Sequence, residues 1–171
     1  MIDTGGLILS QQFYKSLSLI QKMFPISNIE LETFNQKYEA FNFNLEGLSF
    51  KSRLAKKTPL KHGYFVTFWQ KNNINNNEPF NQQNTKDKLV ITVLDGLRSG
   101  QFIFPKKVLI EQNILKTETS KGKMALLVYP SWVNNLNKAA ERTQRWQLQY
   151  FVDLSSTKNQ QEINNLFFGG I

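Results

Sequence analysis

The spacing of apolar residues divides the chain into helical and extended segments. Residues 10–24 have the helical period, and we expect an amphipathic helix there with Ser10 as its N-cap and Pro25 at its end. Its apolar stripe consists of Phe13, Leu17, Ile20 and Phe24.

Residues 38–55 alternate between apolar and polar in two runs separated by Glu46-Gly47. This is the pattern of a β-hairpin with a two-residue turn. The apolar positions are Phe41, Phe43, Leu45, Leu48, Phe50 and Leu54. Successive side chains of a strand point to opposite faces, so the other parity predicts Lys51 and Arg53 side by side on the solvent face.

A loop over residues 56–63, turned by Thr58-Pro59, leads into a predicted strand over 64–71. Four residues share one face of that strand: Phe65, Thr67, Trp69 and Lys71. Residues 72–87 are rich in Asn and Gln and predict a mobile loop.

The rest of the chain predicts three more strands and two helices. The strands cover 89–94, 101–104 and 124–129, and Pro105 opens a short helix that reaches about Gln112. A longer helix is expected over 138–153, with a polar tail after it. Its apolar stripe is Ala139, Thr143, Trp146, Tyr150 and Leu154, and its basic stripe is Lys138, Arg142, Arg145 and Gln149. Helices and strands both occur, so the fold class is α/β, and their order along the chain is α+β-like.

Composition narrows the possible chemistry. The 171 residues are 40% hydrophobic, which is sufficient for one domain with a sizeable core. There is no cysteine and His62 is the single histidine, so disulfides, thiolate nucleophiles and Cys- or His-rich metal sites are excluded. No apolar run approaches the roughly 20 residues of a membrane-spanning helix, and the first residues lack a signal-peptide pattern. We therefore expect a cytoplasmic protein.

Positive charge is concentrated in one part of the chain. There are 21 Lys and Arg against 13 Asp and Glu, which gives a net charge of +8. Residues 47–77 contain no acid and carry Lys51, Arg53, Lys56, Lys57, Lys61 and Lys71. An ordinary mixed-charge surface does not need so long a stretch without acids, so this stretch predicts an anionic partner.

Several blocks of residues between 38 and 151 carry a family resemblance. They are Tyr38-Glu39-Ala40; Arg53, Lys56, Thr58-Pro59, Lys61, Gly63, Phe65-Val66-Thr67, Trp69 and Lys71; Gly100-Gln101-Phe102-Ile103-Phe104-Pro105-Lys106; Gly122-Lys123; Tyr129-Pro130 and Trp132; and Thr143-Gln144, Trp146-Gln147 and Tyr150-Phe151. In this combination the chain resembles the MepB family of small bacterial proteins. The resemblance implies a restriction-endonuclease-like fold, with a central mixed sheet flanked by helices in a single domain. It also implies nucleic-acid binding rather than demonstrated cleavage.

A magnesium-dependent nuclease is one alternative. Nucleases of that fold hold magnesium with an Asp on one strand and an acidic-x-Lys on the next. Here the second position reads Trp69-Gln70-Lys71, with an indole in place of the carboxylate. Glu39 and Asp95 are the carboxylates that a divergent magnesium site would use, and the simpler interpretation of both is a solvated residue at a strand end.

Nucleic-acid binding without catalysis or a cofactor is the leading hypothesis. Cations along a groove contact phosphates, and aromatic rings among them stack on unpaired bases. The candidate contact residues are Lys51, Arg53, Lys56, Lys57, Lys61, Trp69, Lys71, Gln101, Lys106, Lys138, Arg142, Arg145 and Gln149. Trp69 could instead be packed in the core. Gln101 and Gln147 could instead form hydrogen bonds with buried backbone groups.

The expected contacts are sequence-tolerant and made mainly to the phosphates of DNA or RNA. The chain contains only four Arg and shows no helix-turn-helix, zinc-finger or RNA-recognition signature. A third hypothesis is a protein-interaction module for an acidic partner, which would not prefer DNA over heparin. No membrane partner is expected, and the oligomeric state stays open.

Overall fold

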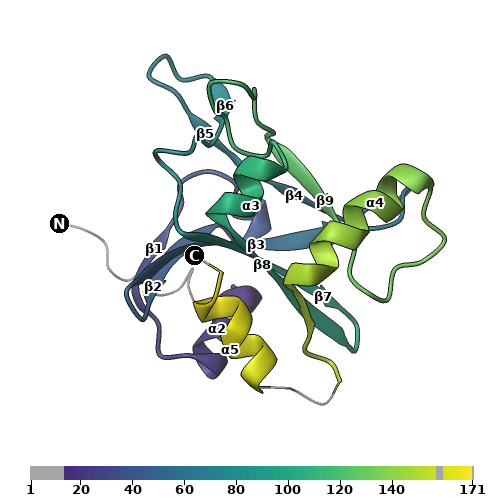
Figure 1. Ribbon diagram of the computed structural model, residues 1–171. Coiled ribbons are helices and arrows are strands. Elements are labelled where there is room, and N and C mark those ends of the chain that lie inside the picture. Colours follow the sequence, from purple (N-terminus) through teal and green to yellow (C-terminus); the bar gives the residue numbers. More distant parts are fainter. Residues whose placement is uncertain (1–13, 157–159, 171) are drawn as a thin grey trace.

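The computed structural model of the protein describes residues 14–156 and 160–170. Its centre is a mixed β-sheet with the strand order β1-β2-β3-β7-β8-β10 (Figure 1). The strands are β1 (Ser27–Leu31), β2 (Phe41–Leu45), β3 (Leu48–Lys57), β7 (Lys88–Asp95), β8 (Arg98–Pro105) and β10 (Phe151–Asp153). β3 and β7 are parallel, and the other neighbours along this path are antiparallel. The expected mixed α/β architecture is confirmed.

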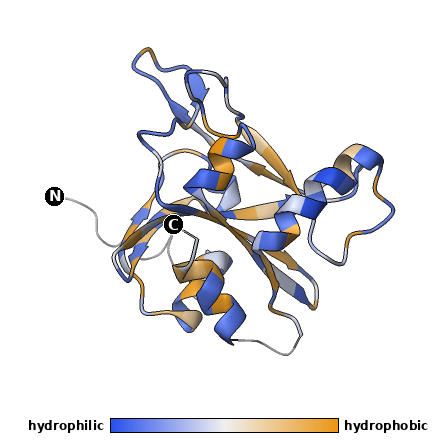
Figure 2. Ribbon diagram, viewed as in Figure 1, coloured by the Kyte–Doolittle hydropathy of each residue, from blue (hydrophilic) through white to orange (hydrophobic). Residues whose placement is uncertain are grey.

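Helices cover both faces of the sheet. The helices α2 (Lys15–Met23) and α5 (Gln160–Phe168) pack on one face, and α3 (Lys106–Glu111) and α4 (Lys138–Gln147) lie on the other side (Figure 1). Hydrophobic residues occupy much of the central strands, whereas α4 is mostly hydrophilic (Figure 2). The helix expected over 10–24 is confirmed within the described residues, and its predicted N-cap Ser10 lies outside them.

The β2–β3 hairpin forms as predicted, with Phe41, Phe43 and Phe50 buried. Its turn, Glu46-Gly47, has φ values of 50° and 77°. Two consecutive positive φ values are typical of the type I′ turn, whose twist matches that of the strands it joins.

The strand predicted over 64–71 is interrupted, which corrects the sequence-based expectation. β4 (Tyr64–Thr67) pairs with the end of β3 and with β9 (Ala125–Val128), whereas β5 (Trp69–Lys71) pairs with β6 (Asn77–Pro79) in a separate sheet. The break lies at Phe68, which is fully buried, with its ring centre 4.6 Å from that of Phe80. Burial of these two rings anchors the arm formed by β5 and β6, so residues 72–87 contain a strand rather than only a loop.

The helix expected over 138–153 ends at Gln147. A 3-10 helix, η2 (Leu148–Tyr150), follows it, and the chain then enters β10, which pairs with β8. Phe151 and Val152 explain the change, because they are buried in two different core clusters on opposite faces of the sheet. Neighbouring residues that are both buried on opposite faces fit a strand and not a helix.

The tail after Leu154 docks on the sheet through α5, where Phe167 is fully buried. Lys88, at the start of β7, is also buried, and its Nζ donates to Leu166 O at 2.7 Å and to Gly169 O. Burial lowers the pKa of Lys88 to about 8. This side chain therefore pairs with a carbonyl in the last turn of α5 and with that of Gly169, the residue after the helix.

Gln147 connects α4 to β9. Its Oε1 accepts from Tyr129 N at 3.0 Å and its Nε2 donates to Leu127 O at 2.9 Å. We expect Gln147→Ala to lower the free energy of unfolding by about 1–3 kcal/mol, because it leaves buried backbone groups unpaired. Urea denaturation measures this, with the exposed Gln149→Ala as the control. An equal effect of the two variants would contradict it.

Candidate nucleic-acid interface

Lys51 and Arg53 lie inside the protein, so the prediction that they face solvent is wrong. Their side chains are 7% and 0% exposed, and both pair with Glu32. Lys51 Nζ lies 2.6 Å from Glu32 Oε1 and Arg53 Nη2 lies 2.6 Å from Oε2. β3 is a central strand covered on both faces, where alternation no longer separates core from solvent. These two cations cannot reach a phosphate at the surface.

Glu32 is held in its ionised form. Burial raises the pKa of Glu32, but the charges of Arg53 and Lys51 outweigh it and leave that pKa below its ordinary value. A lowered folded-state pKa stabilises the fold above the unfolded-state pKa, and this stabilisation is lost as pH falls through the lowered value.

We expect the difference in unfolding free energy between the wild type and Glu32→Gln to shrink from about pH 7 to about pH 3, because the other carboxylates titrate in both proteins and only the wild type has the Glu32 charge to lose. Urea denaturation at several pH values measures it. A difference that does not change with pH would count against the assigned ionisation.

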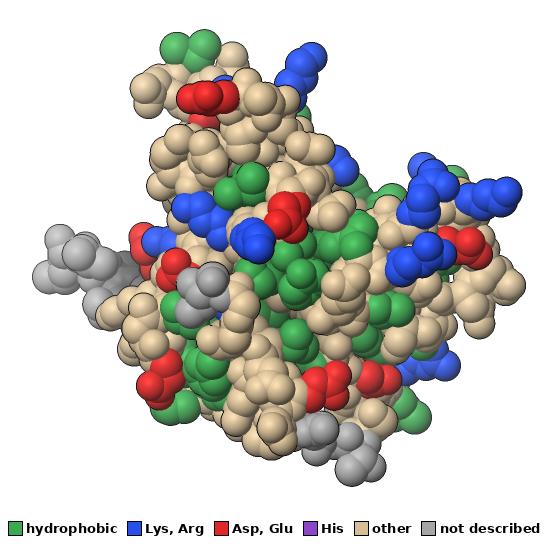
Figure 3. Space-filling model, in the orientation of Figure 1, with side chains coloured by type: hydrophobic (Ala, Val, Ile, Leu, Met, Phe, Trp, Pro, Cys, Tyr) green, Lys and Arg blue, Asp and Glu red, His purple; other side chains and the backbone are tan. Residues whose placement is uncertain are grey.

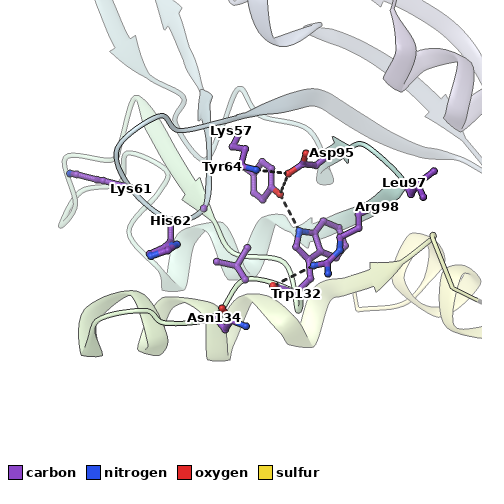
Figure 4. A pocket seen from close by; sticks show the side chains of 11 residues that line it. Lys57, Lys61, His62, Tyr64, Asp95, Leu97, Arg98, Trp132 and Asn134 are labelled. Carbon is purple, nitrogen blue, oxygen red and sulfur yellow. Dashed lines mark hydrogen bonds and ion pairs between the residues drawn. The ribbon is translucent and has the colours of Figure 1, made fainter.

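A groove of about 550 Å³ lies where the loop after β3 approaches the β7–β8 turn and the segment after β9 (Figure 4). We call it the cationic groove. Its lining residues are Lys57, Lys61, His62, Gly63, Tyr64, Asp95, Leu97, Arg98, Trp132, Val133 and Asn134. The loop turns as expected at Thr58-Pro59, since Thr58 Oγ1 donates to the carbonyl oxygens of Lys61 and Gly63.

The side chains at the centre of the groove form a hydrogen-bonded chain (Figure 4). Trp132 Nε1 donates to Tyr64 Oη at 3.1 Å, and Tyr64 Oη donates to Asp95 Oδ2 at 2.6 Å. Lys57 Nζ lies 3.2 Å from the same Asp95 oxygen. The hydrogen bonds from Tyr64 and Lys57 lower the pKa of Asp95. The pKa of Tyr64 is raised, mainly because the phenol is partly buried and also because it donates to Asp95. The one carboxylate among the lining residues is therefore ionised and already paired.

Arg98 is a groove residue that the sequence-based selection of candidates missed. It faces Asp95 across the turn between β7 and β8. Its guanidinium carbon lies 5.7 Å from the centre of the Trp132 ring. The sequence Asp95-Gly96-Leu97-Arg98 indicates this position of Arg98, because a two-residue hairpin turn places the residues before and after it opposite each other.

A second hollow of about 490 Å³ adjoins the cationic groove and shares Lys61 and His62 with it. The helix α4 borders this hollow with Ala139, Ala140 and Thr143. The basic stripe Lys138, Arg142 and Arg145 is exposed, as expected, but these residues do not line the hollow. Lys and Arg side chains gather over α4 (Figure 3).

Three other candidates lie elsewhere or have another role. Gln101 is fully buried and its Nε2 donates to Thr92 Oγ1 at 3.1 Å, so it is not available at the surface. Lys106 begins α3 and lines a separate hollow with Asp87. Gln149 is exposed, but it belongs to η2 and not to the α4 stripe.

Trp69 and Lys71 lie on β5 and line no part of the cationic groove. Trp69 is half-buried and stacks on Phe34, with ring centres 5.5 Å apart. Lys56 and Lys57 point to opposite faces of β3, since Lys56 Nζ lies 5.5 Å from the Tyr38 ring centre and Lys57 pairs with Asp95.

The two carboxylates of the nuclease alternative are engaged separately. Glu39 Oε1 accepts from Ser16 N at 2.9 Å and from Ser16 Oγ at 2.8 Å, at the start of α2. Asp95 binds Tyr64 and Lys57 in the groove. Within residues 14–156 and 160–170, no three acidic or histidine residues gather as metal ligands would. None of the helices in this same part of the chain has the length and apolarity needed to cross a membrane.

The comparisons with known proteins agree with the family resemblance. The sequence profile of the MepB-like family matches residues 32–153, which include β2 to β10 and every residue of the groove. The chain belongs to the MepB-like family. The crystal structure of MepB is similar to this chain at 44% identity and a TM-score of 0.77, covering 85% of this chain and 100% of that one.

More distant comparisons add little. A bacterial homing endonuclease, I-Ssp6803I, is similar at 14% identity and a TM-score of 0.41, covering 87% of this chain and 95% of that one. No curated protein matches the chain.

The MepB-like residues serve both the core and the groove. Arg53 is buried and pairs with Glu32, and Gln147 is buried and hydrogen-bonded to Tyr129 N. Lys61 and Trp132 line the groove. Gly63 has a φ of +99°, and a Cβ there would lie 2.6 Å from the Tyr129 ring. A glycine is therefore required for the loop that carries Lys61 to approach Tyr129.

Proposed function

We propose that this MepB-like protein binds DNA or RNA through phosphates held in the cationic groove, without a catalytic step. The observation that carries the proposal is that Lys57 at the end of β3, Lys61 in the loop after it and Arg98 at the start of β8 line one groove. Fixed cations that converge on a concave surface attract a polyanion more strongly than the same charges dispersed over a surface.

The composition of the groove suits a phosphate backbone. Arg98 can bind phosphate oxygens with two parallel N–H groups, and the two lysines act as point charges. Asn134 adds a neutral side chain to the lining. Phosphates are common to every sequence, so these contacts tolerate many sequences. We also propose that the protein binds its nucleic acid in the cytoplasm.

The basic face of α4 extends the positive field beyond the groove. Lys138, Arg142 and Arg145 are exposed on a helix whose other side borders the hollow next to the groove. Exposed cations within about 10 Å of a bound strand still act on it at low salt. They would raise the association rate more than they would specify the bound position.

Fluorescence anisotropy with labelled single- and double-stranded oligonucleotides tests the proposal. Between about 50 and 200 mM salt, three phosphate contacts give a slope of roughly −2 to −3 for log K against log salt. Heparin serves as a competitor of similar charge, because an interface for acidic proteins would bind it as well as nucleic acid. Absence of binding at the lowest salt, or equal affinity for heparin, would overturn the proposal.

A further inference from the structure

A cavity outside the cationic groove combines aromatic walls with buried polar atoms. It has a volume of about 370 Å³ and lies between segment 33–38 and the junction of β4 and β5. Segment 33–38 contains the 3-10 helix η1 (Gln36–Tyr38). The residues that matter for its chemistry are Phe34, Asn35, Lys37, Tyr38, Thr67 and Trp69, and we call it the aromatic cavity.

The aromatic side of the cavity is held in place. The rings of Phe34 and Trp69 are stacked, with an interplanar angle of 29°. Asn35 supports this stack, because its Nδ2 donates to Trp69 O at 2.8 Å and ties segment 33–38 to β5. Phe34 nevertheless remains 38% exposed, so an apolar ring faces the opening. A fixed, exposed ring is suited to stacking against a planar ligand.

Two polar atoms of the lining residues lack partners. Asn35 Oδ1 and Thr67 Oγ1 have no hydrogen-bond partner among the residues that the structure describes, and Asn35 is only 8% exposed. Buried polar atoms are nearly always paired, so these two atoms have an unmet demand for a partner. Because they expose almost no surface, a ligand in the cavity pairs with them only after a small shift of the side chains that cover them. An amide oxygen accepts and a hydroxyl donates or accepts, which matches the amino and ring nitrogen atoms at the edge of a base.

Cations surround the aromatic rings. Lys71 Nζ lies 5.5 Å from the Trp69 ring centre and 5.9 Å from that of Phe34. Lys37 lines the cavity itself, and Lys56 Nζ lies 5.5 Å from the ring centre of Tyr38. A planar ligand in this cavity would therefore have ammonium groups close to it, as a base with an attached phosphate requires.

We propose that the aromatic cavity binds a nucleobase, which stacks on the Phe34–Trp69 pair and pairs at its edge with Asn35 and Thr67. The attached phosphate contacts Lys37 or Lys71. The base belongs either to a strand held in the cationic groove, an assignment that rests on the proposed function, or to a free nucleotide. A strand that occupies both sites would have to pass the end of β3, where Lys56 faces the cavity side and Lys57 faces the groove side.

The first experiment titrates the protein with adenosine monophosphate and follows tryptophan fluorescence. Stacking of adenine on Trp69 quenches its emission, and Trp69→Phe removes this signal while keeping an aromatic ring. Phe34→Ala and Thr67→Val should each weaken binding, Phe34→Ala by about tenfold or more. Thr67→Val removes the unpaired hydroxyl with little change of shape, so it remains informative if Phe34→Ala folds poorly. Ile74→Ala is the matched control, since Ile74 is 76% exposed at the neighbouring β5–β6 turn and lies outside the cavity lining.

The second experiment compares an oligonucleotide with an abasic strand of the same length and charge. If a base of the strand enters the cavity, the wild type binds the abasic strand about tenfold or more weakly. In Phe34→Ala this preference for bases should disappear, while the salt slope should fall by no more than about one unit, because the groove is intact and only the phosphate contact at the cavity is lost.

The outcomes separate the two proposals. Quenching by adenosine monophosphate with equal affinity for both strands supports the cavity and assigns it to a free nucleotide. Salt-dependent strand binding without quenching and without base dependence overturns the cavity and leaves the groove intact. Quenching without any strand binding supports the cavity and overturns the groove. A quench that Phe34→Ala and Thr67→Val leave unchanged overturns the cavity.

Discussion

Glu32→Ala is expected to lower the free energy of unfolding by about 3–5 kcal/mol, since it leaves two buried cations without their counter-ion. Lys51 and Arg53 are 7% and 0% exposed on their side chains, so solvent screens little of the positive charge that Glu32 balances. For a domain of this size the loss corresponds to a fall in Tm of roughly 6–20 °C. Urea denaturation and thermal unfolding followed by circular dichroism measure the two quantities.

Glu30→Ala is the matched control for Glu32→Ala. Glu30 is an exposed residue of β1, so its removal should change stability by no more than about 0.5 kcal/mol. A second comparison replaces both Lys51 and Arg53 by Met in the Glu32→Ala background. Removing the unpaired charges should recover part of the lost stability. If Glu32→Ala were as stable as Glu30→Ala, the ion pairs would not be needed to keep the two cations inside.

Reversing the charge of Lys57 and Lys61 is expected to lower affinity for oligonucleotides by about 30- to 100-fold near 100 mM salt, equally for all sequences. Each lysine that meets a phosphate contributes about one unit to the salt slope, so the slope should fall in magnitude by about 2 in the double variant. Both side chains are exposed, which keeps the effect on folding small. Anisotropy at several salt concentrations measures affinity and slope together.

Lys121→Glu combined with Lys123→Glu controls for net charge. These exposed lysines line neither the groove nor the aromatic cavity, and the variant changes the total charge by the same amount. It should retain most of the affinity and the full salt slope. If both double variants lost affinity alike, the net charge of the protein would explain binding and the groove would have no special role.

Local pattern is sufficient to predict much of the sheet. The structure has strands at two places where the apolar pattern predicts them. In β2 the pattern is the alternation of buried Phe41 and Phe43, and in β7 it is a continuous apolar run. The same information is insufficient where a partner comes from elsewhere in the chain. Arg53 is polar and alternates with apolar residues, but Glu32 from a distant segment makes its burial possible.

The candidate site shows the same division. Lys57 and Lys61 could be selected from charge alone, because most lysines remain at the surface, although Lys51 and Arg53 of the same stretch do not. The hydrogen bond between Tyr64 and Trp132 joins residues that are 68 positions apart, and no spacing rule connects them. The α4 stripe was identified correctly as exposed, but its orientation relative to the groove depends on how Gln147 holds the helix against β9.

The parallel pairing of β3 with β7 has a consequence for synthesis of the protein. Phe50 pairs with Lys88, so one edge of β3 acquires its neighbour only after many more residues have been added. At about 5–20 residues per second, the ribosome leaves that edge open for roughly 2–8 s. An open strand edge is where nascent chains aggregate, and charged side chains in the strand oppose such pairing. We therefore expect Lys51 and Arg53 to oppose such pairing of β3 in the nascent chain before they become part of the folded interior.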